Sequence, residues 1–371
     1  MKLHRFGVEE WLNVHEQHAK YDLASVSIDS LTLEELFDLT TTKSEIFYQD
    51  LSQKKMDYGW IEGSPAFKIA ASQIYESVMP DQILQTNGAT GANLLALYAL
   101  IEPGDHVVSL YPTYQQLYDI PKSLGAEVDF WHIKKALDWL PDINELRQLI
   151  RPNTKMICIN NANNPTGAVM DEAYLKELVA IAQESGAYIL ADEVYLSFSS
   201  QKVPAIADLY DKGISVNSLS KTYSIPGIRV GWVATSHDIT NILRDYRDYT
   251  MICAGVFDDM VATLTLENKQ AILNRNRKII KENLVILDQW IATEPKASYI
   301  RPAEVSTSFI KLEVALPIEE FCLKLLKNYG VLVVPGNRFG YEGHIRLGYC
   351  CDQEILKEGL RLLSQSLKEL D

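Results

Sequence analysis

Lys221 stands among small hydroxyl side chains and glycines, where a lysine amine could act as a nucleophile. The stretch reads Ser-Leu-Ser-Lys-Thr-Tyr-Ser-Ile-Pro-Gly-Ile-Arg-Val-Gly from Ser218 to Gly231, so the guanidinium of Arg229 follows the amine eight residues later. An amine attacks a carbonyl when its pKa is lowered and it is held in place. Hydroxyls and a guanidinium fork bind phosphate. Together these groups suit a Schiff base with pyridoxal 5'-phosphate; the alternative is a surface Lys-Ser turn that enters a strand.

Four further polar segments follow short apolar runs that are typical of strands. In an open α/β sheet, ligands bind beyond the carboxyl ends of the strands, so these segments are expected at one edge. Small residues that open a helix let backbone N–H groups approach an anion, and a buried aspartate needs a cationic partner. Taken singly, they could also be a glycine turn capping a helix, a surface tyrosine or an aspartate capping the next helix. The segments are Asn87–Ala92, Tyr111–Tyr114, Asn160–Gly167 and Ala191–Tyr195.

In this order, the segments resemble the cofactor site of the class I and II aminotransferases, which are fold-type-I pyridoxal-phosphate enzymes. The stretch from Ser218 to Gly231 matches that family's lysine attachment site at every position the family restricts. The Asn-Pro-Thr-Gly sequence at 164–167 is a second, fairly specific match. The resemblance runs from about Tyr58 to the C-terminus.

The resemblance implies a role for each polar residue of the site. Lys221 would carry the cofactor pyridoxal 5'-phosphate covalently and then act as the general base for the proton transfer at the substrate. No metal is expected. The resemblance assigns the phosphate to Ala89, Thr90, Ser218 and Arg229, the ring face to Tyr114, the phenolate oxygen to Asn164 and Tyr195, and the pyridine nitrogen to Asp192.

Two more residues are implied in substrate binding and assembly. Arg346 lies in the apolar run Ile345–Gly348, and a buried guanidinium is stabilised by a planar anion. The resemblance implies that this anion is the α-carboxylate of an amino-acid substrate, with Asn164 beside it. Tyr58 resembles the tyrosine that reaches the phosphate of the neighbouring subunit. That match implies a homodimer with shared active sites.

Apolar runs that alternate with helical stretches predict an α/β fold with a doubly wound, mostly parallel sheet, the fold of type-I pyridoxal-phosphate enzymes. After about residue 255 the pattern becomes α+β, which predicts a second, smaller domain. We therefore expect a large cofactor-binding domain at 41–264 and a small domain made of 1–40 and 265–371, with the first forty residues packed on the C-terminal part. The predicted strands are 107–110, 156–159, 187–190, 228–232, 309–312, 331–334 and 345–348, and the predicted helices include 171–184, 269–290 and 318–329.

Composition narrows the class of protein. The 371 residues carry a formal charge of −14, which argues against nucleic acid or an acidic membrane as a general partner. Five cysteines without CxxC spacing indicate reduced thiols, and Cys350–Cys351 are adjacent. No signal-peptide core opens the chain and no apolar run reaches the roughly 20 residues of a membrane helix. We expect a soluble, cytoplasmic enzyme.

Two segments resemble binding motifs only superficially, and two others lack glycines that are usual in the family. His15–His18 is one residue short of the zinc-protease spacing, so a solvated helix face is expected there, and Gly88–Gly91 is no dinucleotide fingerprint. The usual glycine is absent from Leu23–Ser30, and Ala303–Ser308 replaces a glycine-rich stretch. Both segments touch substrate in relatives, so the amino acid and the oxo acid are not readable from the sequence.

The resulting hypothesis is an aminotransferase that moves the amino group of an α-amino acid to a 2-oxo acid. One alternative is a lyase or cyclising enzyme on the same fold, by β-elimination or by cyclisation of a modified arginine as in capreomycidine synthase. Such a reaction needs a second acid near Lys221, and only Tyr195 or a loop residue suggests itself. The other alternative is a non-catalytic ligand-sensing domain, which the acidic balance and the lack of a helix-turn-helix extension disfavour.

Overall fold

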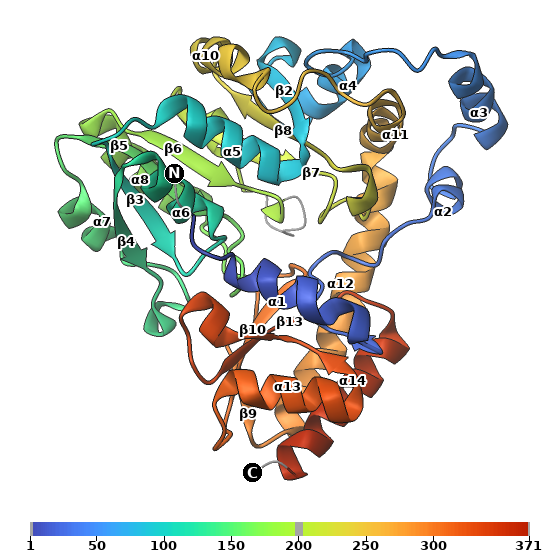
Figure 1. Ribbon diagram of the computed structural model, residues 1–371, viewed down its shortest axis with the longest axis vertical. Coiled ribbons are helices and arrows are strands. Elements are labelled where there is room, and N and C mark those ends of the chain that lie inside the picture. Colours follow the sequence, from blue (N-terminus) through green and yellow to red (C-terminus); the bar gives the residue numbers. More distant parts are fainter. Residues whose placement is uncertain (1–2, 197–202, 370–371) are drawn as a thin grey trace.

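A seven-stranded sheet lies at the centre of the larger part of the molecule in the computed structural model, which describes residues 3–196 and 203–369 (Figure 1). Its strand order is β2-β8-β7-β6-β5-β3-β4. Only β8 runs antiparallel to its neighbours in this sheet; the other pairs are parallel. The strands are β2 (Ile83–Asn87), β3 (His106–Tyr111), β4 (Glu127–His132), β5 (Thr154–Asn160), β6 (Tyr188–Asp192), β7 (Gly213–Ser218) and β8 (Val230–Thr235).

Both faces of this sheet are buried. On β5, Met156 and Cys158 belong to one hydrophobic cluster, while Ile157 and Ile159 belong to another on the opposite face. Helices on the two faces make the sheet doubly wound, which confirms the predicted fold class. The helices of this part are α3 (Ser44–Gln53), α4 (Pro65–Ser72), α5 (Gly88–Leu100), α6 (Gln116–Leu124), α7 (Ile143–Leu149), α8 (Glu172–Ser185), α9 (Ile206–Leu209), α10 (His237–Arg247) and α11 (Val256–Glu267).

Local signals explain where the elements begin and end. Asp171 accepts a hydrogen bond from the N–H of Tyr174 at 2.8 Å and so caps α8, which ends at Gly186 with φ +72°; the predicted helix is confirmed. The predicted strand 228–232 begins two residues late, because residues 226–228 form a 3-10 turn. Strands β2, β4 and β7 were not predicted as strands.

A four-stranded antiparallel sheet, β12-β13-β10-β9, forms the smaller part. The predicted strand 331–334 is split, because β11 pairs in parallel with β1 near the N-terminus and β12 joins the sheet. Between residues 3 and 196 and between 203 and 369, no helix has the length and hydropathy of a membrane span. The elements are β1 (Tyr21–Asp22), β9 (Ala297–Tyr299), β10 (Thr307–Leu312), β11 (Val331–Leu332), β12 (Val334–Pro335), β13 (His344–Gly348), α12 (Lys269–Thr293), α13 (Ile318–Tyr329) and α14 (Gln353–Glu369).

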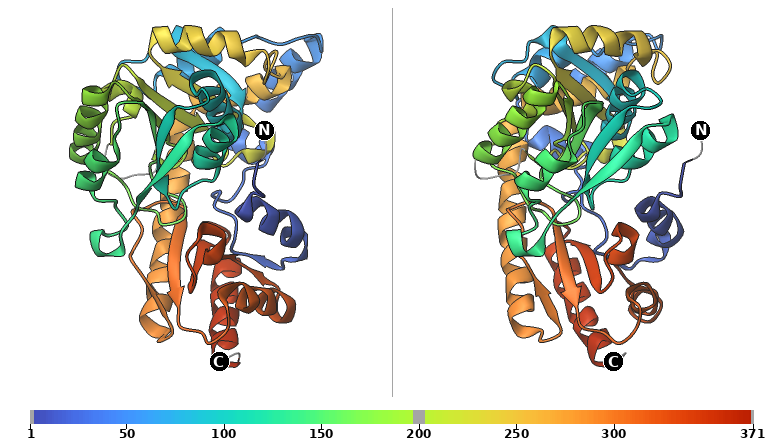
Figure 2. Two further views of the ribbon diagram at one scale, coloured as in Figure 1. Left: turned by 60° about the vertical axis from the view of Figure 1, so that its left-hand side comes forward. Right: turned by 90° about the vertical axis from the view of Figure 1, so that its left-hand side faces the viewer.

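The N-terminal segment joins the two parts. Helix α1 (Gly7–His15) lies beside the smaller sheet and below the larger one (Figure 2). Trp11 donates from Nε1 to the carbonyl of Val333 at 2.9 Å, and the N–H of Gly7 donates to Gln115 Oε1 at 2.8 Å. Helix α2 (Leu33–Asp38) instead packs in a cluster with α4 and β8. The domain boundaries at 41 and 264 stay a prediction.

Strand β8 and the first turn of α5 touch through glycine. A Cβ on Gly231 would lie 2.4 Å from the carbonyl carbon of Gly88 and 2.6 Å from the nitrogen of Ala89. These are backbone atoms, which cannot rotate away. The close approach holds the N-terminus of α5 against the end of β8.

Gly231→Ala is therefore expected to destabilise the protein by about 1–3 kcal/mol, the usual cost of overpacking a filled site. Gly227→Ala is the matched control, because a Cβ there meets nothing within 4 Å. Thermal unfolding of the apoprotein followed by circular dichroism measures the difference. Equal melting temperatures for the two variants would contradict the tight contact between β8 and α5.

Candidate active site

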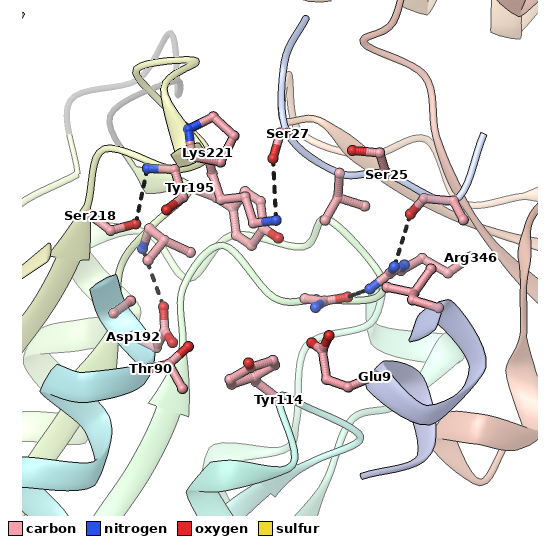
Figure 3. A pocket seen from close by; sticks show the side chains of 18 of the residues that line it. Glu9, Ser25, Ser27, Thr90, Tyr114, Asp192, Tyr195, Ser218, Lys221 and Arg346 are labelled. Atoms are coloured by element: carbon pink, nitrogen blue, oxygen red, sulfur yellow. Dashed lines mark hydrogen bonds between the residues drawn. The ribbon is translucent and has the colours of Figure 1, made fainter. Parts of the chain in front are cut away.

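A cavity of about 690 Å³ lies where the larger sheet, the smaller part and α1 meet. Figure 3 shows side chains from all three converging on it. A volume of this size suits a cofactor together with a small substrate. Ten of the eleven residues predicted from the sequence line it: Ala89, Thr90, Tyr114, Asn164, Asp192, Tyr195, Ser218, Lys221, Arg229 and Arg346.

Lys221 follows β7 in a loop that is held from behind by α12. Asn276 on α12 donates to the carbonyl of Thr222 at 2.8 Å, and the Thr222 hydroxyl donates to the carbonyl of Val194 at 2.5 Å. The amine itself donates to Ser27 Oγ at 3.4 Å. The loop is thus fixed on one side while the amine faces the cavity.

The electrostatic surroundings keep this amine basic but partly neutral. Burial lowers the pKa of Lys221 to about 8, and the positive charge of Arg346 acts in the same direction. Arg229 adds to the effect, while the carboxylates of Glu9 and Asp192 oppose it. At pH 7 roughly a tenth of the amine is therefore unprotonated, far more than for an ordinary lysine, and a nucleophile or a general base needs this neutral form.

An anion cradle forms at the N-terminus of α5, where Ala89 and Thr90 line the cavity. Gly88 has φ +67°, and a Cβ on it would lie 2.6 Å from a terminal nitrogen of Arg229. Arg229 itself has φ +52° and donates to Ser220 Oγ at 3.3 Å. A left-handed conformation costs a non-glycine residue roughly 1–2 kcal/mol. The backbone of Arg229 therefore adopts an unfavourable conformation where its guanidinium lies over the helix terminus. Backbone N–H groups, hydroxyls and a guanidinium together suit a phosphate.

Asp192 ends β6 and is 3% exposed. It accepts a hydrogen bond from Asn93 Nδ2 at 2.8 Å and a longer one, at 3.4 Å, from the N–H of Val194. Burial raises the pKa of Asp192, whereas these hydrogen bonds and the charge of Lys221 lower it. A protonated ring nitrogen in the cavity would supply the cation that this carboxylate lacks.

Two tyrosines border the same space. Tyr195 is buried next to the end of β6, and burial raises its pKa. Tyr114 packs against Phe6 with ring centroids 5.0 Å apart, and burial raises its pKa as well. Both phenols therefore stay protonated at neutral pH and can donate a hydrogen bond.

Arg346 on β13 closes the cavity from the side of the smaller sheet. Its terminal nitrogens donate to Asn164 Oδ1 at 3.3 Å and to the carbonyl of Ala24 at 2.9 Å. The side chain is 3% exposed, and its Nε has no partner among the described residues. A buried guanidinium with an unused donor is suited to a carboxylate.

The residues present therefore fit pyridoxal 5'-phosphate. The cradle at α5 suits its phosphate, Asp192 suits its ring nitrogen and Lys221 suits its carbonyl. The Gly88 position, which a Cβ would fill, and the unpartnered Arg346 Nε are independent signs of a built anion site.

Tyr58 is the exception among the predicted residues. It lies outside this cavity, lines two surface hollows and is 79% exposed. Other large apolar residues near it are also exposed, namely Met56, Trp60 and Ile61.

Residues 6–30 form a wall of the cavity. A substrate contact was expected from the sequence for Leu23–Ser30, but not for the residues before this segment. Ten of the twenty-five lining residues belong to residues 6–30, which we call the N-terminal wall. It includes Glu9, a carboxylic acid in the same cavity as Lys221, so the expectation that only Tyr195 or a loop residue could be a second acid is corrected. Glu9 had no sequence signal. Asn93 did have a sequence signal, because a single asparagine in the otherwise apolar helix α5 needs a hydrogen-bond partner when it is buried.

The family model described as Aminotransferase class I and II matches residues 30–363. Among solved structures, a PLP-dependent aminotransferase from Streptococcus suis 89-1591 is 70% identical, covers 100% of this chain and 99% of its own, and superposes with a TM-score of 0.98. A PLP-dependent cyclase, OrfR, is 26% identical with a TM-score of 0.92, over 100% of this chain and 98% of its own. Capreomycidine synthase from Streptomyces vinaceus is 28% identical over 97% of this chain and 93% of its own.

The charge balance around Lys221 predicts how its pKa responds to substitution. Arg346→Met removes a positive charge that disfavours the ammonium form, so the pKa of Lys221 should rise from about 8 toward the ordinary value of lysine. Glu9→Gln removes a carboxylate that favours the ammonium form and should lower it. The pH dependence of apoprotein modification by trinitrobenzenesulfonate, with Lys221 located by peptide mass spectrometry, measures both shifts. A modification midpoint that neither substitution moves would contradict this account; Arg338→Met, outside the cavity, is the control.

Proposed function

Because the chain belongs to the class I and II aminotransferase family, we propose that its reaction takes place in the cavity around Lys221. The protein is a pyridoxal-phosphate-dependent aminotransferase. The observation that carries it is the convergence of Lys221, Asp192 and Arg346 on one cavity. They supply an amine, a carboxylate for the ring nitrogen and a cation for the substrate carboxylate.

When bound, pyridoxal phosphate offers a carbonyl to amines and an electron sink that makes the substrate Cα–H acidic. Lys221 would hold the cofactor through its amine, and the same amine would accept the proton from Cα of a bound amino acid. Arg346, with Asn164, holds the α-carboxylate and so fixes which bond at Cα faces Lys221. Asp192 stays ionised against the ring nitrogen.

The remaining residues hold the cofactor in place. Ala89, Thr90, Ser218 and Arg229 bind the phosphate. Tyr114 would face the cofactor ring, and Tyr195 and Asn164 would donate hydrogen bonds to its phenolate oxygen. The amino group passes from an α-amino acid to a 2-oxo acid.

A second candidate reaction is cyclisation or elimination at the same cofactor. It is favoured by the similarity to a synthase and a cyclase across nearly the whole chain and by Glu9, an acid that could protonate a leaving group. Both reactions begin with the same proton transfer to Lys221. Transamination would leave the cofactor as pyridoxamine phosphate, whereas cyclisation or elimination would leave it as pyridoxal phosphate.

A homodimer with shared active sites is also proposed. Tyr58 and its exposed apolar neighbours are arranged as a surface suited to a second copy of the chain. In that assembly Tyr58 reaches the phosphate bound in the partner subunit. The five free cysteines support a reducing compartment, the cytoplasm.

With a reactive amino acid and no oxo acid, the enzyme should accumulate pyridoxamine phosphate, and Arg346→Met should lower kcat/KM for this half-reaction at least about a hundredfold. A charge-assisted hydrogen bond is worth about 1.5–3 kcal/mol, and the fork makes more than one. Arg338→Met, whose guanidinium binds Glu319 outside the cavity at 2.6 Å, is the control. The cofactor spectrum is the measurement, over all the standard amino acids.

Steady release of ammonia, or a cyclised product with the cofactor spectrum unchanged, would replace transamination by the second candidate reaction. No spectral response to any amino acid, with the cofactor bound, would contradict the proposed function itself.

Mixed dimers test the role of Tyr58. If Tyr58 serves the partner's site, a dimer of one Tyr58→Phe subunit and one Lys221→Ala subunit has one site with both lesions and one with neither. Adding inactive Lys221→Ala protein to Tyr58→Phe protein should then raise its activity about tenfold, the effect of one regained hydrogen bond to a charged group. Tyr249→Phe, at an equally exposed tyrosine, should show no such gain. No gain with Tyr58→Phe, or a monomer in solution, would contradict shared sites.

A further inference from the structure

The N-terminal wall of the cavity is acidic. Glu9 projects from α1 into the cavity on the side of Tyr114 (Figure 3), and Glu16 and Asp22 line the cavity as well. No basic residue of this wall lines the cavity within the part of the chain that the structure describes. Among the described residues, the N-terminal wall therefore contributes only negative charge to the cavity.

The cavity has more carboxylates than cations after the groups that would bind the cofactor and the substrate α-carboxylate are counted. Three lining cations have assigned partners: Lys221 the cofactor carbonyl, Arg229 the phosphate and Arg346 the α-carboxylate. Asp192 is taken by the ring nitrogen. Of the described lining residues, three carboxylates are then left over and no cation is left.

Glu9 is the one of these three that is placed to bind a ligand. Asp22 already accepts hydrogen bonds from the N–H groups of Ala24 and Ser25, at 2.8 and 3.1 Å, and Glu16 is exposed. Glu9 is half-buried and has no hydrogen bond or ion pair within the described residues. Its neighbour Glu10, by contrast, binds Arg5 at 2.6 Å and Arg338 at 3.3 Å.

The charge of Glu9 acts on the reacting groups. It opposes the lowering of the pKa of both Lys221 and Arg346. It therefore lies within electrostatic reach of the amine that would take the substrate proton and of the guanidinium that would hold the α-carboxylate.

Helix α1 holds this carboxylate in position. Val8 and Trp11 are buried on either side of it along the helix. Trp11 is tied to Val333, and Gly7 is tied to Gln115. A carboxylate on a helix anchored at both ends pays little entropy when it binds a cation.

We propose, on the basis of the aminotransferase function above, that the substrate is an α-amino acid whose side chain ends in a cation, a guanidinium or a primary ammonium, and that Glu9 binds this cation. Arg346 and Glu9 then grip opposite ends of one substrate, the carboxylate and the side-chain cation. A dicarboxylic amino acid is disfavoured, because its second carboxylate would face three carboxylates and no cation.

Arginine and citrulline test the proposal, since they share their shape and differ in charge. The holoenzyme should convert arginine with a kcat/KM about ten- to a hundredfold above that for citrulline, the range that one charge-assisted hydrogen bond supplies. Glu9→Gln should abolish most of this ratio, chiefly by slowing arginine. Glu10→Gln removes the same charge one residue away, outside the cavity, and should leave the ratio unchanged. Lysine against norleucine repeats the comparison for an ammonium.

Binding without turnover is the second measurement. 5-Guanidinopentanoate has the carboxylate and the guanidinium but no α-amine, so it cannot react with the cofactor. Calorimetry on the holoenzyme should show it binding about ten- to a hundredfold more tightly than the neutral 5-ureidopentanoate. Glu9→Gln should remove that difference, while a Glu9→Gln protein that retains its cofactor and its melting temperature shows that the fold is intact.

Three results would overturn the proposal while leaving the aminotransferase function in place. Neutral or dicarboxylic amino acids could react better than arginine, lysine and ornithine. Glu9→Gln and Glu10→Gln could change the arginine-to-citrulline ratio equally. Glu9→Gln could instead improve every amino acid equally, which would assign Glu9 to neutralising Arg346. Failure of the function itself looks different, because then no amino acid changes the cofactor spectrum.

Discussion

The burial of the Asp192 carboxylate at the end of β6 is the constraint on which the site depends. A carboxylate that is 3% exposed is tolerated when hydrogen bonds and a cation compensate its lost hydration. Asn93 on α5 and the backbone of Val194 provide part of this compensation. The rest must come from the cavity, which is why the group that fills it has to carry a positive charge beside Asp192. The helix that supplies Asn93 also lines the cavity at its N-terminus with Ala89 and Thr90, so the sites proposed for the two ends of the cofactor share one helix.

Lys221, unlike Asp192, depends on nearby charges that disfavour its ionised form. Its amine must stay partly neutral, and burial together with two guanidinium groups lowers its pKa to about 8. The same two guanidinium groups are the ones that we propose for the two anions of the reaction, the phosphate and the substrate carboxylate. Occupation of these anion sites would therefore weaken the effect of both arginines on Lys221 and make its amine more basic, which favours acceptance of a proton once substrate is in place.

The sequence was most informative in short contiguous segments, where the chemistry of the site allows few residue types at each position. The lysine loop, the Asn-Pro-Thr-Gly turn and the strand that ends at Asp192 are contiguous segments, and all of them line the cavity. The strands β4 and β7 escaped prediction because β4 is only partly buried and β7 contains serine and asparagine, so neither has the apolar run that marked its neighbours. Glu9 escaped for another reason: its place in the cavity follows from contacts that α1 makes with residues more than a hundred and more than three hundred positions away.

The match to the class I and II aminotransferases covers residues 30–363 and contains every group that we assign to the cofactor and to the α-carboxylate. The N-terminal wall lies almost wholly before residue 30, where this match begins, and we assign no cofactor group to it. A reaction common to many amino acids can be encoded in the shared region, because it involves only atoms that all amino acids have. The choice among them depends on residues that contact the substrate side chain, and in this chain the N-terminal wall offers carboxylates for that contact.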